Sequence, residues 1–414
     1  MKTAQEFKQH FEAISQAVMA ELLPGEHAAV TYQGERSEFM RFNACKVRQS
    51  GSVEQAELGV KLFRGTKSYA VSVMLSGILE DDLTRMGKAV SQARSVMGLL
   101  PDDPYLVLPE ATERSEAQYS GKLLSLESIP QRVLTPAQGM DFTGIYSQGI
   151  ICKGSANSAG AKHWFATETF LVDYSAWLAN GRAVKSSYAG REWSDEDYAS
   201  RIAATRMALE NLHKPQVELK PGAYRAFVTA DALNEVVVFF SWNGLGEKGI
   251  RQGESSYLAL REGRESFSPM FGLDQDFTLG VEPAFNEEGE LAPQKLCLIE
   301  NGKLKNTIVS SRTAKQYGVA ANGASAWESI AAGSLPLADA LKALGTGIYV
   351  SNFHYLNWSD TASARITGMT RFSCLWVENG QIVGPIKDMR WDESLYAMLG
   401  SKLEAVTKER NLIV

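Results

Sequence analysis

Alternating apolar and polar residues near the N-terminus constrain the fold more than any other feature of this chain. The alternation runs through four segments, at 28–33, 38–48, 53–63 and 68–73. Ser50-Gly51 and Arg64-Gly65 supply turns between three of them. The pattern predicts an antiparallel meander with one face toward water.

One amphipathic helix is predicted before this meander in the sequence, and another after it. The first spans 4–23, where apolar residues recur at steps of three and four and Pro24-Gly25 ends the pattern. The second spans about 80–100, with Asp81 and Asp82 at its positive end. A helix, a meander and a helix make a compact α+β unit.

Further strands and a helix are predicted up to residue 213. Asn180-Gly181 predicts a type I′ hairpin turn, and Ser194 begins a helix that runs to about Asn211. The 414 residues exceed what one hydrophobic core usually serves. We therefore expect an N-terminal α+β domain over 1–213, with sub-regions 1–100 and 113–213, and a mostly antiparallel β domain over 214–414.

The second domain is predicted from weaker signals. Thr229 caps a helix over 230–241 that is apolar nearly all round and should be buried. Residues 243–269 show little periodicity and indicate a long exposed loop. Hairpin turns are expected at Asn301-Gly302 and Asn379-Gly380, and a helix is expected over 392–408. The predicted fold class is α+β.

Composition excludes several classes of function. The net charge of −6, without clustered Lys or Arg, argues against direct nucleic-acid binding. No apolar run approaches the length of a membrane span, and the polar N-terminus reads as a helix rather than a signal peptide. The four cysteines are scattered singly, which is typical of reduced thiols. We expect a cytoplasmic protein.

The common catalytic motifs are missing from the sequence. The five histidines lie far apart, so no pair shares a helix turn as in HExxH, and we predict no metal site and no cofactor. No GxSxG motif is present. His354 and Cys374 could form a nucleophilic pair, but a lone cysteine on an apolar face is usually a small buried hydrophobe. The glycines of 243–249 follow a helix, the reverse of a phosphate-binding loop.

The densest group of polar residues between predicted strands lies in 345–385. Its candidates for binding substrate are Asn352, His354, Asn357, Asp360 and Arg365. They could line a groove and bond to a peptide backbone. Alternatively, the amide and carboxylate side chains satisfy turn and strand-end backbone groups, as they do routinely. Both interpretations stay open, and no catalytic residue is predicted.

Motifs along the chain resemble those of the TldD/PmbA family, named for modulators of DNA gyrase. They are the sequences at 347–360, 365–371 and 376–380 together with Pro385-Ile386, and shorter pieces at 48–54, 154–160 and 267–269. The resemblance implies an α+β fold and a peptidase system that cleaves unfolded polypeptides and matures small peptides. Catalytic TldD-type members carry HExxxH on a helix just inside the C-terminal region, with a later cysteine as a further zinc ligand.

This chain departs from that zinc motif. It has no histidine over 235–248, and Cys374 does not match the context of the zinc cysteine. It therefore resembles the PmbA/TldE-like branch, and the resemblance implies a dimer in which this subunit shapes a peptide groove for a TldD-like zinc-bearing partner or a second copy of itself. A stand-alone peptidase with an unrecognised site and a non-catalytic peptide-binding or regulatory module remain alternatives.

Overall fold

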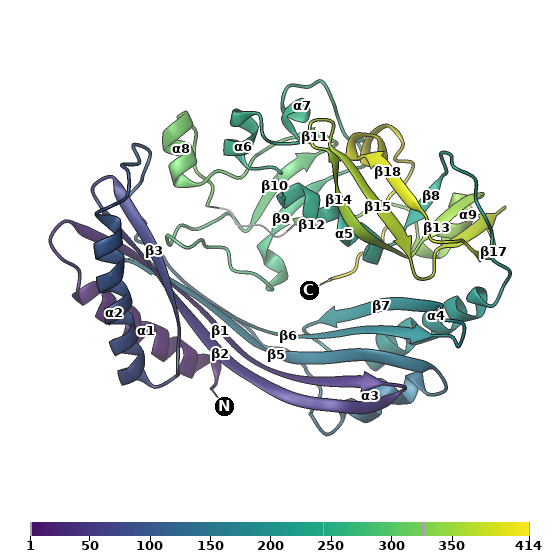
Figure 1. The fold of residues 1–414 in the computed structure, drawn as a ribbon, viewed down its shortest axis with the longest axis horizontal. Coiled ribbons are helices and arrows are strands. Elements are labelled where there is room, and N and C mark those ends of the chain that lie inside the picture. Colours follow the sequence, from purple (N-terminus) through teal and green to yellow (C-terminus); the bar gives the residue numbers. More distant parts are fainter. Residues whose placement is uncertain (1, 243, 324–327, 414) are drawn as a thin grey trace.

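A long curved sheet forms the lower layer of the molecule, and the C-terminal half lies against its concave face (Figure 1). The computed structural model describes residues 2–242, 244–323 and 328–413. Within these ranges helices and mostly antiparallel strands alternate, which confirms the predicted α+β class. No helix among these residues is both long enough and apolar enough to cross a bilayer.

The N-terminal half contains seven strands and four helices among its described residues. In order they are α1 (Ala4–Ala20), β1 (Glu26–Asn43), β2 (Lys46–Arg64), β3 (Lys67–Met74), α2 (Leu79–Met97), β4 (Arg114–Tyr119), α3 (Ile129–Ala137), β5 (Asp141–Asn157), β6 (Lys162–Trp177), β7 (Ala183–Gly190) and α4 (Asp195–Leu212). All seven strands join one sheet in the order β3-β2-β1-β5-β6-β4, and β7 pairs with β6 beside β4. Only the β4–β6 pair is parallel.

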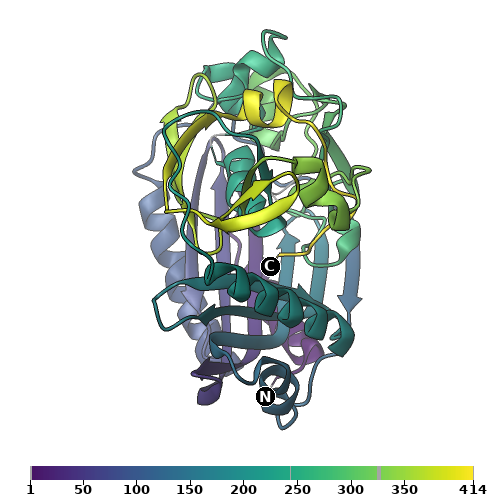
Figure 2. The ribbon, with the colours of Figure 1, turned by 90° about the vertical axis from the view of Figure 1, so that its right-hand side faces the viewer.

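All four of these helices cover the same face of the sheet. At one end α1 and α2 pack on it, and the rings of Phe11, Tyr32 and Trp164 lie 5.6–5.9 Å apart there. At the other end α3 and α4 pack around Phe42 and Tyr174. Tyr32 and Phe42 are an even number of residues apart on β1, so both point to this face. The opposite, concave face is left to the C-terminal half (Figure 2).

The C-terminal half holds three smaller sheets and short helices. In order its elements are β8 (Ala226–Val228), α5 (Ala230–Ser241), α6 (Glu247–Gln252), α7 (Leu258–Arg261), β9 (Leu273–Asp276), η1 (Phe277–Leu279), β10 (Lys295–Glu300), β11 (Lys303–Leu304), α8 (Ser311–Tyr317), β12 (Glu328–Ile330), η2 (Leu337–Asp339), α9 (Ala340–Leu344), β13 (Gly347–Val350), β14 (Asn352–Asp360), β15 (Arg365–Arg371), β16 (Leu375–Glu378), β17 (Gln381–Pro385), β18 (Arg390–Ser394) and η3 (Ala397–Ser401). The sheets are β11-β10-β9-β12, β17-β16-β13-β8 and β14-β15-β18.

The predicted helix starts are confirmed where a capping side chain exists. The Ser194 hydroxyl accepts from the Asp197 amide at α4, and the Thr229 hydroxyl accepts from the Ala232 amide at α5. Each cap satisfies a backbone donor that would otherwise be unpaired. The division near residue 213 remains a prediction.

The first hairpin turn lies at a different place from the one that the sequence predicts. β2 runs unbroken through Ser50-Gly51, and the chain turns instead at Ala44-Cys45, where φ is +49° and +56°. These angles are those of a type I′ turn, which usually contains Asn or Gly. The predicted hairpin at Asn180-Gly181 is confirmed by the antiparallel pairing of β6 with β7, but Asn180 does not take a positive φ, so the predicted type I′ turn is wrong. The hairpins at Asn301-Gly302 and Asn379-Gly380 do have positive φ at both residues.

Three predictions in the C-terminal half are corrected by tertiary packing. Residues 244–269 are not an exposed loop, because they form α6 and α7 and bury Tyr257 and Phe267. Asn243 of the glycine-rich segment lies outside the described residues. Helix α5 is not buried all round, since Val238 is 49% exposed. The expected final helix is instead β18 followed by the short π-helical turn η3, because β18 pairs with β15.

Candidate functional site

The five candidate residues lie on the β14–β15 hairpin but at different ends of it. Asn352 pairs with Arg371 at one end, and Asp360 pairs with Arg365 at the other. Six residues separate His354 from Asp360, which places them roughly 20 Å apart along an extended strand. His354 and Asp360 therefore do not meet in one catalytic cluster.

Three of the candidates make local contacts. Asp360 accepts from the Ala362 amide at 3.1 Å and the Ser363 hydroxyl at 2.5 Å, and the bond from Ser363 is the main cause that lowers the pKa of this carboxyl. Arg365 pairs with Asp392 on β18. The Asn357 side chain accepts from the backbone amide of the next residue at 2.8 Å. These contacts satisfy polar groups of the β14–β15 turn and pair charges between β15 and β18.

Asn352 and Cys374 lie together inside the fold. Asn352 is 7% exposed, and its Oδ1 has no hydrogen-bond partner among the described residues. The Cys374 thiol donates to the backbone carbonyls of Asn352 at 3.7 Å and Arg371 at 3.3 Å. Burial raises the pKa of Cys374, so the thiol is protonated at neutral pH. A buried neutral thiol is a poor nucleophile.

His354 has neighbours that sequence reasoning missed. Burial raises the pKa of Asp388, and the nearby charges of Arg371 and His354 oppose that rise. The next residue, Tyr355, is 78% exposed and adopts φ +53° at a break in the β14–β15 register. A bulky residue in this region of φ is strained, and such strain is often found at functional sites.

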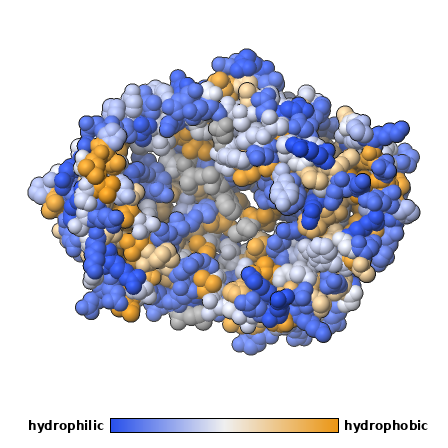
Figure 3. All heavy atoms as spheres, in the orientation of Figure 1, coloured by the Kyte–Doolittle hydropathy of each residue, from blue (hydrophilic) through white to orange (hydrophobic). Residues whose placement is uncertain are grey.

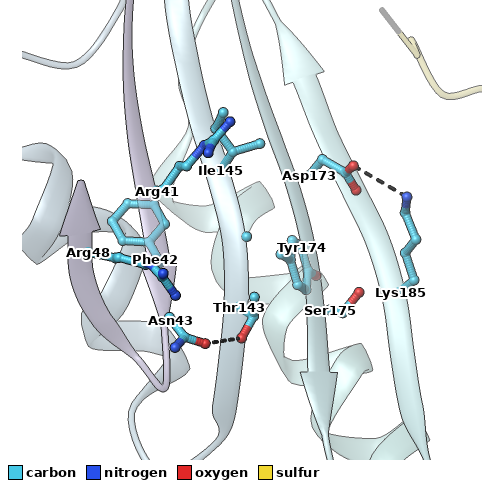
Figure 4. A pocket seen from close by; sticks show the side chains of 11 residues that line it. Arg41, Phe42, Asn43, Arg48, Thr143, Ile145, Asp173, Tyr174, Ser175 and Lys185 are labelled. Carbon is cyan, nitrogen blue, oxygen red and sulfur yellow. Dashed lines mark hydrogen bonds and ion pairs between the residues drawn. The ribbon is translucent and has the colours of Figure 1, made fainter. Parts of the chain in front are cut away.

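A pocket of about 440 Å³ opens on the concave face of the large sheet, and sequence reasoning missed it altogether. Its wall is built from β1, β2, β5, β6 and β7 (Figure 4). The charged side chains that line it are Arg41, Arg48, Asp173 and Lys185. Arg48 is the first residue of the family motif at 48–54, and this motif was the sequence signal that could have pointed to the pocket.

The residues present do not fit a zinc ion. Helix α5 carries no histidine, and Glu235 on it is exposed. In the described ranges no three His, Cys, Asp or Glu side chains gather as metal ligands. His163 is engaged by the Ser115 hydroxyl at 2.8 Å and the Gly289 carbonyl at 3.0 Å. His10 lies 3.2 Å from Asp82 between α1 and α2.

Comparison with known proteins identifies the C-terminal half of the chain and its overall fold. Residues 221–414 match the family described as the PmbA/TldA metallopeptidase C-terminal domain. The whole fold resembles the crystal structure of TldE from Thermococcus kodakarensis, with a TM-score of 0.75 and 14% identity over 99% of this chain and 95% of that one. Residues 221–414 therefore carry the C-terminal domain of this family, and the whole chain has the fold of TldE. The predicted resemblance is thereby confirmed.

Two further structures support the TldD/PmbA fold over nearly the full length. A candidate modulator of a DNA gyrase from Thermotoga maritima gives a TM-score of 0.72 and 16% identity over 98% of this chain and 97% of that one. Another, from Bacteroides thetaiotaomicron, gives 0.73 and 14% over 96% and 92%. A sequence comparison with curated proteins found no match.

Proposed function

We propose that this chain is a PmbA/TldE-like subunit without a metal site, which holds an extended peptide for a zinc-bearing TldD-like partner. One observation carries the proposal. The region that matches a metallopeptidase domain includes α5, and that helix has no histidine. Peptide hydrolysis is therefore assigned to the partner, and substrate holding to this chain.

The concave face of the large sheet supports the peptide-holding role. Half-buried apolar side chains from β5 and β6, namely Ile145, Ile151 and Leu171, lie on it. The surface is hollowed between this sheet and the C-terminal half (Figure 3). β7 pairs only with β6 among the described strands, so no strand covers its other edge, although Arg201 on α4 donates to the Ser187 carbonyl of β7 at 3.3 Å. An extended peptide can add to such an edge through backbone hydrogen bonds.

The junction between the two halves adds polar groups near that edge. Asp231 lies in the first turn of α5, and burial raises the pKa of its carboxyl. The Ser186 hydroxyl on β7 and the Arg201 guanidinium on α4 oppose this rise. The start of α5 therefore lies against β7, which supports a groove formed by both halves.

Co-purification and metal analysis test the proposal. The chain is expressed alone and together with an HExxxH relative from the same genome. We expect a complex between the two, zinc only in the relative, and cleavage of an unfolded polypeptide only by the complex. One tightly bound zinc per chain in the isolated protein, with cleavage by that protein, would contradict the proposal. Failure to recover any HExxxH relative would favour the non-catalytic binding module.

A stand-alone hydrolase is a second candidate, favoured by the His354–Asp388 neighbourhood beside the strained Tyr355. It predicts that the isolated chain cleaves a denatured peptide. The cleavage would be lost in His354→Ala and kept in His27→Ala, a histidine distant from this hairpin. No turnover by the isolated protein would reject this candidate.

A further inference from the structure

A β-bulge changes the direction of Arg48 in the large sheet. β1 and β2 pair in regular register up to Arg41 and Gln49, and the next pair is Phe42 with Val47. Arg48 is therefore an extra residue on β2. In a bulge, two residues of one strand stand opposite one residue of the other, and both can point to the same face of the sheet as that residue. Here Arg48 and Gln49 stand opposite Arg41, which points to the concave face. Both arginines thus line the pocket on the concave face, Arg41 beside Ile145 and Arg48 near Asn43 (Figure 4).

The charges of this pocket are unbalanced. Lys185 pairs with Asp173 at 3.3 Å. Neither Arg41 nor Arg48 has a carboxylate within 4.0 Å among the residues that the structure describes, and both are exposed. The Arg41 guanidinium lies only over the ring of Phe39, at 5.8 Å. The pocket therefore keeps two positive charges without an anionic partner.

We propose that this pocket binds a carboxylate of the held peptide, either its C-terminal carboxylate or an Asp or Glu side chain. The inference rests on the proposed peptide-holding function. An arginine presents a planar fork that matches both oxygens of a carboxylate, and bonds of this kind are stronger than neutral ones. The half-buried Ile145 gives the residue that carries the carboxylate an apolar surface.

The size and position of the pocket suit a short stretch of peptide. A volume of about 440 Å³ is at the lower end of the usual range for ligand pockets. The pocket crosses β1, β5, β6 and β7, and three spacings between these strands correspond to about 14 Å. Lys185 lies on β7, whose free edge belongs to the proposed groove. A peptide that starts at that edge needs about four extended residues to cross the sheet and bring a carboxylate to the arginines.

Direct binding to the full-length chain tests the inference without any need for cleavage. Three labelled peptides of one uncharged sequence are compared by fluorescence anisotropy: one with a free C-terminus, one amidated, and one amidated with a single internal Glu. We expect the amidated uncharged peptide to bind about tenfold more weakly than at least one of the others, because it has no carboxylate. Which of the two binds tightly identifies the source of the carboxylate.

Variants of the pocket complete the test. Arg41→Gln/Arg48→Gln should weaken binding of the carboxylate peptide about tenfold and leave the amidated uncharged peptide unchanged. Arg48→Lys keeps the charge and loses the fork, so an intermediate loss is expected. The matched control is Arg85→Gln/Lys88→Gln, which removes the same charge from exposed positions on α2, on the other face of the sheet.

The outcomes distinguish failure of the carboxylate pocket from failure of the proposed peptide-holding function. Equal binding of all three peptides, or equal loss in the pocket and α2 variants, would overturn the carboxylate pocket and leave the peptide groove standing. No binding of any peptide would overturn both. Loss confined to the pocket variants and to the peptides that carry a carboxylate supports the inference.

Discussion

A buried carboxylate in the C-terminal half offers a sharp test of how this fold is stabilised. The Glu247 side chain is 2% exposed. Its oxygens accept from Arg251 at 2.8 Å, from Arg261 at 2.7 and 3.1 Å, and from the Thr307 hydroxyl at 2.7 Å. Burial raises the pKa of Glu247, but these hydrogen bonds outweigh burial and hold the pKa at about 2.

The magnitude follows from the linkage between protonation and folding. A pKa lowered from 4.5 to about 2 corresponds to about 3 kcal/mol of stability at neutral pH. Arg251 and Arg261 are 42% and 37% exposed, so solvent screens part of this attraction and we expect about 2 kcal/mol. The folded-state pKa is depressed. This stability is therefore present above pH 4.5 and lost as the pH falls toward 2.

Urea unfolding of Glu247→Gln at pH 7 and pH 3 measures this contribution. We expect the variant to lose about 2 kcal/mol at pH 7 and clearly less at pH 3, because at pH 3 the carboxyl of the unfolded wild-type chain is largely protonated while that of the native chain is not. Glu404→Gln is the control, because Glu404 is 60% exposed and pairs with Arg225 at the surface. The reasoning is refuted if the two variants lose equal stability, or if the loss for Glu247→Gln does not depend on pH.

Two further predictions concern the candidate hairpin. Burial raises the pKa of Cys374, so its thiol should resist alkylation in the folded protein at pH 7 and react after unfolding, as mass spectrometry of labelled peptides would reveal; rapid labelling in the native state would contradict this. Tyr355 has φ +53°, so Tyr355→Gly should be about 1 kcal/mol more stable than Tyr355→Ala, the reverse of the order expected at an ordinary strand position. A thermal melt in which the alanine variant is the more stable one would show that this backbone is unstrained.

Local sequence signals predicted the features that depend on neighbouring residues. Ser194 and Thr229 mark helix starts, because a hydroxyl can bond to an amide three residues later. Asn301-Gly302 and Asn379-Gly380 form the expected turns, because both residue types tolerate positive φ. The family motifs likewise led to the α+β fold and to the TldD/PmbA assignment.

Features that depend on residues far apart in the sequence were not predicted. Ala44 and Cys45 carry no turn signal, yet the pairing of the long strands β1 and β2 places the turn there. Residues 390–394 form a strand because β15 is beside them, whatever their own preference. The candidate residues of 345–385 do not form one cluster, because the pairing of β14 with β15 makes an extended hairpin with His354 and Asp360 at different ends.

The sequence by itself therefore determined the capped helix starts, the two Asn-Gly turns and the absence of histidine from α5. These properties depend on residue chemistry within a few positions of the chain. Only the tertiary structure decided which charged side chains line the same pocket. Arg41, Arg48 and Lys185 lie on three different strands, and only the register of the sheet and one bulged residue place them around a common pocket.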